Sequence, residues 1–368
     1  MKVSIGSRIV RGPWGGGNLF AINLTNFLTE KGHEVIYDLS EPDIDLILLT
    51  DPRSRSESSS TFNHEDIMKY QNFVKPNVSI IQRINECDER KSTENINNFY
   101  LNASEVADHV VFVSSWLRDI YLNIGMEENK TSVILAGANN KIFNNEGLSL
   151  WDENKKLKLV THHWSSHKNK GFDVYEDIDN LLNNKNWEES LEFTYIGNVS
   201  RNYEFKNTNL VSPLAGKDLA NELKNHHVYI TGSINEPSGN HHIEAAQCGL
   251  PILYKNSGGI PEYCDGFGIS FENDNLIEKL DLMTNQYGKY IEKLKTYPFN
   301  SEKMCNEFLS LFNSVVEQKN FQRIEVHSNN NKKYIYLTKN KILKYTRKLI
   351  SINLKSYLIN IVKKVYKR

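Results

Sequence analysis

Short apolar segments alternate with segments of helical period along the chain, and this alternation runs through twice. In the first series the expected strands are residues 2–9, 34–39, 46–50, 78–84, 109–113 and 132–135. In the second series they are residues 157–161, 191–196, 228–231 and 251–254. Strands that are separated by helices form parallel sheets with helices on both faces. The sequence therefore predicts an α/β chain with two doubly wound domains in tandem.

A polar and aperiodic segment, residues 144–156, separates the two series and is the expected linker. We therefore divide the chain into an N-terminal Rossmann-like domain (1–145), a C-terminal Rossmann-like domain (146–320) and a tail (321–368). Domains of this kind bind ligands beyond the carboxyl ends of their strands. Two of them facing each other are expected to enclose a ligand cleft.

The composition excludes several classes of protein. Of the 368 residues, 39 % are apolar and 24 % are charged, which excludes a disordered or collagen-like chain. No apolar run approaches the roughly 18–20 residues that span a bilayer, and the first residues lack the apolar core of a secretion signal. The four cysteines are far apart and are expected to be reduced thiols. These features favour a cytoplasmic protein.

The tail is strongly basic. Residues 321–368 hold 13 lysines and arginines and one acid, whereas residues 1–320 carry a net charge of −13. Apolar residues such as Ile342, Tyr345 and Leu349 recur in the tail at helical spacing. This pattern predicts a basic amphipathic helix that lies on an anionic membrane surface. A helix that packs on the acidic body is the alternative, and nucleic acid is disfavoured because no recognition motif accompanies the charge.

Two carboxylates near the end of the second series are the first residues that indicate a binding site. Glu236 lies in the loop after an expected strand, and Glu244 lies about one turn inside the next helix. A carboxylate can accept both hydroxyls of a vicinal diol, as in a ribose or a pyranose. The helix N-terminus beside them favours an anion such as a diphosphate. The alternative is a pair of surface acids near a helix start.

A glycine-rich turn follows one strand later. It has the sequence Gly258-Gly259-Ile260-Pro261-Glu262. Two glycines bring backbone N–H groups close to a ligand, and proline suits the first turn of a helix. Such a turn can hold a phosphate, although by itself it is more often a plain turn.

Together these motifs resemble the family 4 glycosyltransferases of the GT-B fold. The shared elements are E-x7-E, a helix of small residues, G-L-P at residues 249–251 and the GG-x-x-E turn. The resemblance implies that Glu236 contacts the transferred sugar near the reacting carbon and that Glu244 holds the ribose. It implies that the Gly258, Gly259 and Ile260 backbone meets sugar hydroxyls and the diphosphate. It extends over about residues 1–320, and its C-terminal motifs are the specific part.

A second glycine-rich loop lies at residues 15–18, between the first strand and the first helix. It does not match a dinucleotide fingerprint, because Phe20 stands where a third glycine is needed. It is similar to the Gly-Gly loop of the same family, which places Gly16 and Gly17 against the donor phosphate or the acceptor from the opposite domain. The alternative is a flexible strand–helix turn.

Residues 161–172 occupy the place of the family motif G-R-x-x-x-x-K-G, in which the arginine and lysine neutralise the donor diphosphate. Lys170 fits the motif and is a predicted catalytic residue beside Glu236, but Ser165 stands where the arginine belongs. His163, His167 and Lys168 are the candidates to share its work. The histidine spacing does not favour zinc, and we expect neither a metal nor another cofactor.

The resemblance implies a glycosyltransferase of the hexosyltransferase type. Such an enzyme moves a sugar from a nucleotide-sugar to a saccharide or lipid-linked acceptor, with retention of configuration, in surface polysaccharide or glycolipid synthesis. Arg83, near the end of the fourth expected strand, and Asn85, just after it, are assigned to the acceptor or the transferred sugar. The resemblance implies that the leaving phosphate acts as the base toward the acceptor. The sequence offers no evident covalent nucleophile. A nucleotide-sugar epimerase and a non-catalytic nucleotide-sugar-binding protein are the alternatives.

Overall fold

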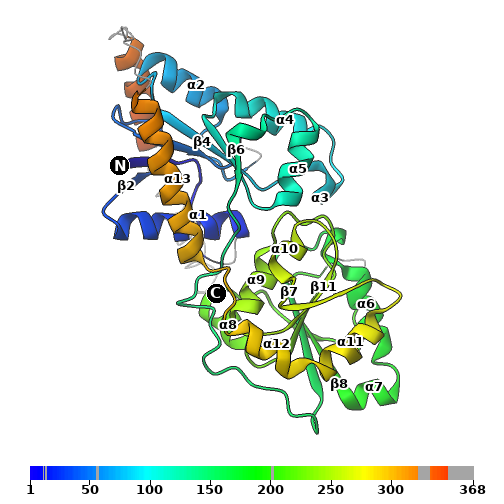
Figure 1. Cartoon of the computed structure of the whole chain (residues 1–368). Helices are drawn as coiled ribbons and strands as arrows, with labels where there is room; N and C mark the ends of the chain where they lie inside the picture. Colours follow the sequence, from blue (N-terminus) through cyan, green and yellow to red (C-terminus); the bar gives the residue numbers. More distant parts are fainter. Residues whose placement is uncertain (11, 13–14, 55–57, 200–202, 322–331, 347–368) are drawn as a thin grey trace, which may run out of the picture.

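The computed structural model describes the whole chain except residues 11, 13–14, 55–57, 200–202, 322–331 and 347–368. It shows two α/β lobes, each built on a six-stranded sheet whose paired strands are all parallel (Figure 1). The predicted fold of two Rossmann-like domains is confirmed. No helix among the described residues is long and apolar enough to cross a membrane.

The N-terminal lobe has the strand order β2-β1-β3-β4-β5-β6. Its strands are β1 (Lys2–Ile5), β2 (Glu34–Ile36), β3 (Leu46–Leu49), β4 (Ser79–Ile84), β5 (His109–Phe112) and β6 (Thr131–Val133). Its helices are α1 (Gly16–Glu30), α2 (His64–Phe73), α3 (Asp88–Lys91), α4 (Ile96–Ala103) and α5 (Ser115–Asn123), with the 3-10 turns η1 (Ser104–Val106) and η2 (Glu128–Lys130). β3 and β4 are buried along their whole length because helices cover both faces of the sheet.

The C-terminal lobe has the strand order β12-β11-β10-β7-β8-β9. Its strands are β7 (Leu157–His163), β8 (Leu191–Gly197), β9 (Asn209–Val211), β10 (Val228–Thr231), β11 (Ile252–Lys255) and β12 (Gly268–Phe271). The helices after residue 163 are η3 (Lys168–Lys170), α6 (Phe172–Leu181), α7 (Lys185–Ser190), α8 (Gly216–Leu223), α9 (Asn240–Gln247), α10 (Ile260–Cys264), α11 (Leu276–Asn285), α12 (Tyr287–Leu294) and α13 (Ser301–Phe321).

Some of these elements are absent from the sequence prediction. The helix α2 has mostly polar residues and only two buried ones, Ile67 and Tyr70, so its apolar period is weak. Its start is marked instead by a capping box between Asn63 and Asp66. The edge strands β9 and β12, and the helices α7, α11 and α12, were likewise not expected.

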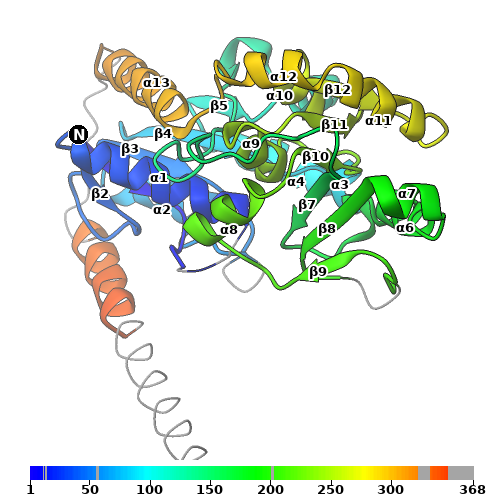
Figure 2. The ribbon, with the colours of Figure 1, turned by 90° about the horizontal axis from the view of Figure 1, so that it is seen from below.

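The last long helix returns to the first lobe. Met304, Phe308 and Phe312 of α13 are buried in the same core cluster as residues of β1 and α1. The rings of Phe308 and Phe20 lie 5.1 Å apart. Figure 2 shows α13 running beside α1. The domain boundaries at residues 145 and 320 remain a prediction, but in its packing α13 completes the N-terminal lobe.

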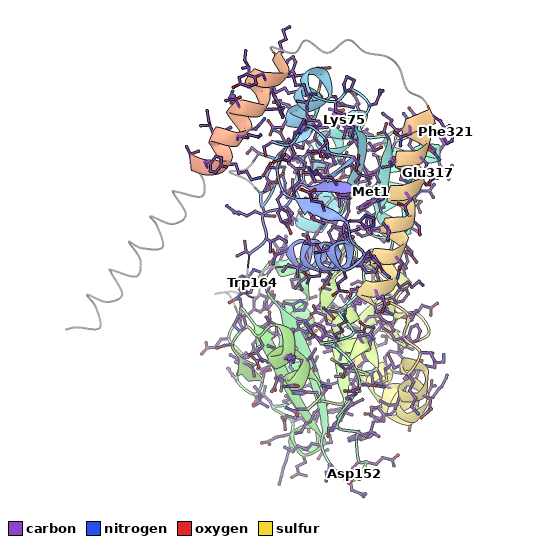
Figure 3. All side chains as sticks on the ribbon, turned by 90° about the vertical axis from the view of Figure 1, so that its left-hand side faces the viewer. Met1, Lys75, Asp152, Trp164, Glu317 and Phe321 are labelled. Carbon is purple, nitrogen blue, oxygen red and sulfur yellow. The ribbon has the colours of Figure 1, made fainter. Side chains whose placement is uncertain are left out.

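The described part of the tail, residues 332–346, forms a helix that packs on the N-terminal lobe. Figure 3 shows it on the side of the lobe opposite α13. The ring of Tyr336 lies 6.3 Å from that of Tyr70, and its hydroxyl donates to the carbonyl of Asp66 at 3.1 Å. Lys344 forms an ion pair with Asp38 at 3.1 Å. This part of the tail therefore contacts the body, while Leu349 and the rest of the predicted amphipathic helix lie outside the described residues.

Candidate active site

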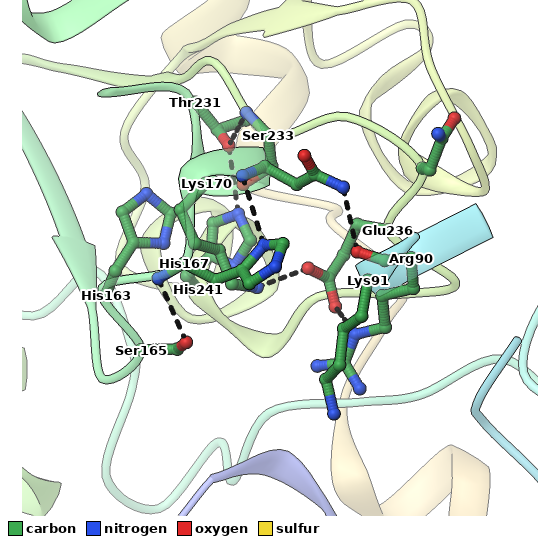
Figure 4. A network of polar contacts seen from close by, with 12 residues as sticks. Arg90, Lys91, His163, Ser165, His167, Lys170, Thr231, Ser233, Glu236 and His241 are labelled. Carbon is green, nitrogen blue, oxygen red and sulfur yellow. Dashed lines mark hydrogen bonds and ion pairs between the residues drawn. The ribbon is translucent and has the colours of Figure 1, made fainter. Parts of the chain in front are cut away.

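Glu236 lies at the centre of a polar network between the lobes (Figure 4). It follows β10 in a loop that ends at Gly239, the residue before α9. Its carboxylate forms ion pairs with Lys170 and, at 3.3 Å to Nε, with Arg90. The side chain of Glu236 is only 7 % exposed and that of Lys170 only 13 %. The two predicted catalytic residues are thus in direct contact.

The charges in this network depend on one another. Burial alone would raise the pKa of Glu236, but Arg90 and Lys170 outweigh burial and lower it to about 2. Burial lowers the pKa of Lys170, and the negative charge of Glu236 opposes that shift. Glu236 is therefore a carboxylate at neutral pH, held by two cations in a site from which water is largely excluded.

Glu244 is a buried residue of α9 and pairs with a histidine. Its Oε2 lies 3.0 Å from Nε2 of His162, the next-to-last residue of β7. The backbone N–H of His162 donates to the hydroxyl of Tyr229 at 3.1 Å. The predicted helix start and the place of Glu244 one turn inside it are confirmed. Its partner His162 was not predicted.

His163 points into the C-terminal lobe. Its Nε2 lies 2.6 Å from the hydroxyl of Tyr175, and its ring lies 4.6 Å from that of His241. Burial lowers the pKa of His163 and of His241 well below the usual value, so both rings are neutral. His163 thus brings no positive charge to the network, whereas Lys168 is exposed on the nearby turn η3. Among the described residues, no group of histidine, cysteine and acidic side chains could hold a metal ion.

The glycine turn supports the loop of Glu236. Gly258 has a φ of +65°, and a Cβ there would lie 2.6 Å from the backbone N and O of Glu236. The N–H of Gly259 donates to the carbonyl of Glu236 at 2.9 Å. This amide is therefore already hydrogen-bonded within the protein. The Ile260 side chain is fully buried, and Pro261 lies in the first turn of α10 as predicted.

Residues of the N-terminal lobe face the Glu236 network from the opposite side. A Cβ on Gly16 would lie 2.7 Å from Oδ1 of Asn240, the first residue of α9, so the two lobes meet there. A Cβ on Gly17 would lie 4.0 Å from Nδ2 of Asn85. Arg83 is buried and stacks on the ring of Phe20 at 4.0 Å. Burial lowers the pKa of Arg83 to about 10.

Like His162, Arg90 is a site residue that the sequence analysis missed. It belongs to the short helix α3, which follows the carboxyl end of β4. The only signal in the sequence is that position, because sites in parallel sheets lie beyond the carboxyl ends of strands. Ser165, where the sequence lacks the expected arginine, lies on the loop that leads to η3. Figure 4 shows Arg90 approaching Glu236 from the other lobe.

Comparisons with known proteins agree with this geometry. Residues 191–297, which hold Glu236, Glu244 and the glycine turn, match the family model of group 1 glycosyl transferases. The chain has no match in sequence among proteins of curated function. A glycosyltransferase from Rickettsia africae is 16 % identical, with a TM-score of 0.61 over 86 % of this chain and 98 % of that one.

Two further solved structures are similar. Anabaena HepE in complex with UDP-glucose is 12 % identical, with a TM-score of 0.62 over 85 % of this chain and all of that one. WaaG, a glycosyltransferase involved in lipopolysaccharide biosynthesis, is 12 % identical, with a TM-score of 0.58 over 83 % of this chain and 99 % of that one. The fold is GT-B. In this GT-B chain the network around Glu236 lies where α3 of one lobe meets the loops of the other.

Proposed function

We propose that this protein is a glycosyltransferase that moves a sugar from a nucleotide-diphosphate sugar to a hydroxyl of a saccharide or lipid-linked acceptor. The observation that carries the proposal is the buried carboxylate of Glu236, paired with Lys170 beside the start of α9. A carboxylate and an ammonium at one point suit a reaction in which positive charge develops on a sugar and negative charge on its leaving group. The match of residues 191–297 to group 1 glycosyl transferases supports the same reaction.

In the proposed reaction, the bond between the anomeric carbon and the phosphate oxygen breaks, and its electron pair stays on the diphosphate. The acceptor oxygen bonds to the same face of the anomeric carbon, and its proton passes to the leaving diphosphate. Lys170 neutralises that diphosphate, while Glu236 faces the sugar. Closure of the lobes excludes water, which would otherwise compete with the acceptor.

The remaining predicted residues have supporting roles in this proposal. Glu244 accepts the ribose hydroxyls, and the N-terminus of α9 favours the negative charge of the phosphates. Gly16 faces the start of α9 from the opposite lobe, and Gly17 lies beside Asn85. Arg83 and Asn85 are assigned to the acceptor or the transferred sugar. The protein's own cations supply the positive charge, so the proposal includes no metal ion.

We further propose that the acceptor is part of a surface polysaccharide or glycolipid and that the protein acts at the inner face of an anionic membrane. The helix at residues 332–346 leaves Ile342 and Tyr345 exposed by 58 % and 66 %. Lysines lie beside these apolar side chains, at positions 339, 341 and 344. Apolar and basic side chains on one exposed helix favour an anionic lipid surface. WaaG, of similar fold, is involved in lipopolysaccharide biosynthesis.

The test is a panel of UDP-, GDP- and ADP-sugars, with release of nucleoside diphosphate as the readout. One donor should be turned over, and Glu236→Gln should lower kcat on the order of 100-fold. Glu188→Gln, an exposed acid on α7, is the matched control and should retain turnover. Release from no donor, together with no saturable binding by calorimetry, would overturn the proposal. A new sugar nucleotide formed without an acceptor would instead identify an epimerase.

A further inference from the structure

The helix α3 belongs to the N-terminal lobe but is hydrogen-bonded to the C-terminal lobe. The carbonyl of Arg90 accepts from Nδ2 of Asn169 at 3.0 Å, and the carbonyl of Glu89 accepts from Nδ2 of Asn235 at 3.2 Å. Asn169 and Asn235 are the chain neighbours of Lys170 and Glu236. The backbone of Arg90 is therefore fixed against the two loops that form the centre of the proposed site.

The side chains gathered at this point carry an excess of positive charge. Arg90 and Lys91 pair with Glu86 at 3.3 and 2.9 Å, while Arg90 and Lys170 share Glu236. Three cations thus meet two carboxylates.

The other charged groups nearby do not remove this excess. Asp88 and Glu89 of α3 turn toward the start of α4, where they accept hydrogen bonds from Asn97. The neighbouring rings of His163 and His241 are neutral, because burial lowers their pKa. Excess positive charge in a site of low exposure is costly, and an anionic ligand would offset that cost.

Arg90 is placed to bind such an anion. Its Nε and Nη1 contact Glu236 and Glu86, while its Nη2 donates no hydrogen bond to another described residue. The side chain is 27 % exposed, so Arg90 is not completely buried. A guanidinium is a planar fork that binds two phosphate oxygens at once, which an ammonium cannot do.

We propose that Arg90 is the arginine of the donor diphosphate site and that it reaches the leaving group from the opposite lobe. This inference rests on the proposed function. Arg90 and Lys170 bind the diphosphate from two sides, and Arg90 forms no covalent bond in the transfer. Both cations can therefore contact the leaving group only when α3 contacts the C-terminal lobe. This arrangement explains how a chain with Ser165 in the expected arginine position can stabilise a departing diphosphate.

The first test is calorimetry of wild type, Arg90→Ala and Arg90→Lys with inorganic pyrophosphate, UDP, GDP and ADP. Arg90→Ala should weaken binding of pyrophosphate and of the preferred nucleoside diphosphate by about 10- to 100-fold. Binding of the corresponding nucleoside, which lacks phosphate, should stay unchanged. Arg90→Lys should recover part of the loss. Arg118→Ala is the matched control, because Arg118 also pairs with a glutamate and is 24 % exposed.

The second test moves the arginine to the other lobe. The double variant Arg90→Ala/Ser165→Arg should recover diphosphate binding that Arg90→Ala has lost, and kcat should recover with it. Diphosphate binding by Arg90→Ala equal to that of wild type would overturn the assignment and leave the proposed function intact. Equal weakening of nucleoside and diphosphate binding would also overturn it, because that pattern marks a structural role. No binding or turnover by wild type would overturn the proposed function, and this assignment with it.

Discussion

The carboxylate of Glu262 in the C-terminal lobe accepts the backbone N–H of Trp116 in the N-terminal lobe at 3.0 Å. Its second oxygen accepts the N–H of Ser115 at 2.9 Å. These are the first two residues of α5, so the last residue of the glycine turn caps a helix of the other lobe. A negative charge at a helix N-terminus satisfies free N–H groups and interacts favourably with the helix dipole. The same turn thus supports Glu236 and links the lobes.

We expect Glu262→Ala to favour opening of the lobes. The variant removes two hydrogen bonds and a charge at a helix start, an interaction worth about 1 kcal/mol. The measurement is small-angle X-ray scattering without ligand, in which the radius of gyration should increase. Glu262→Gln keeps one acceptor oxygen and should give an intermediate value. A radius equal to that of wild type in both variants would show that this contact does not hold the lobes together.

The ionisation of Glu236 predicts how stability depends on pH. Its pKa is about 2 in the folded protein, because Arg90 and Lys170 outweigh the effect of burial. A glutamate in an unfolded chain titrates near a pKa of about 4.3. A carboxyl whose pKa is lower in the folded state stabilises the fold above the unfolded pKa, and this contribution is lost as the pH falls.

The free energy of unfolding of wild type should therefore fall more steeply between pH 5 and 3 than that of Glu236→Gln. Urea unfolding at several pH values measures both curves. Parallel curves would contradict the assignment of Glu236 as a paired carboxylate. Because Glu236 remains ionised from pH 5 to 9, it should contribute no limb to the pH profile of turnover in that range.

The turn at Gly258 offers a test of local geometry. Alanine at a positive φ costs about 1 kcal/mol, and here its Cβ would also lie 2.6 Å from the backbone of Glu236. Gly258→Ala should lower stability by more than that and should reduce donor turnover, because the loop of Glu236 must shift. Gly266→Ala is the control, since Gly266 has a φ of +82° with nothing within 4 Å of its Cβ position. Equal stability and equal turnover in the two variants would show that the close approach has no consequence.

The proposed membrane surface can be tested in the described helix. Ile342→Glu should reduce cosedimentation with vesicles that contain anionic phosphatidylglycerol by severalfold, because it places a negative charge on the exposed apolar side. Leu210→Glu changes a residue of similar exposure, 55 %, on β9 of the other lobe and should leave binding unchanged. Neutral vesicles should bind neither protein. Equal binding by wild type and Ile342→Glu would count against this surface.

The sequence was most informative where a structure depends on neighbours in the chain. The apolar run at β3 identified a buried strand, because a strand covered on both faces must be apolar throughout. Pro261 marked a helix start because its fixed backbone conformation is a local property. The sequence analysis missed the helix α2, although its capping box is a local signal. It identified helices by their apolar period, which is weak in α2.

The sequence analysis did not predict contacts between segments that are distant in the chain. The spacing of Glu236 and Glu244 did not reveal that one faces Arg90 and the other His162. Nor did it show that α13 leaves the second series and packs beside Phe20 in the first lobe.

Periodicity and turn chemistry act over a few residues, so they were enough to predict the two α/β domains and the loop and helix that carry Glu236 and Glu244. Which charges meet depends on the packing of distant segments. Arg90 and Glu236 lie on different lobes, and their interaction depends on a site that excludes water. Ionic interactions gain strength in such a site, and its shape follows from the packing of both lobes rather than from any one segment.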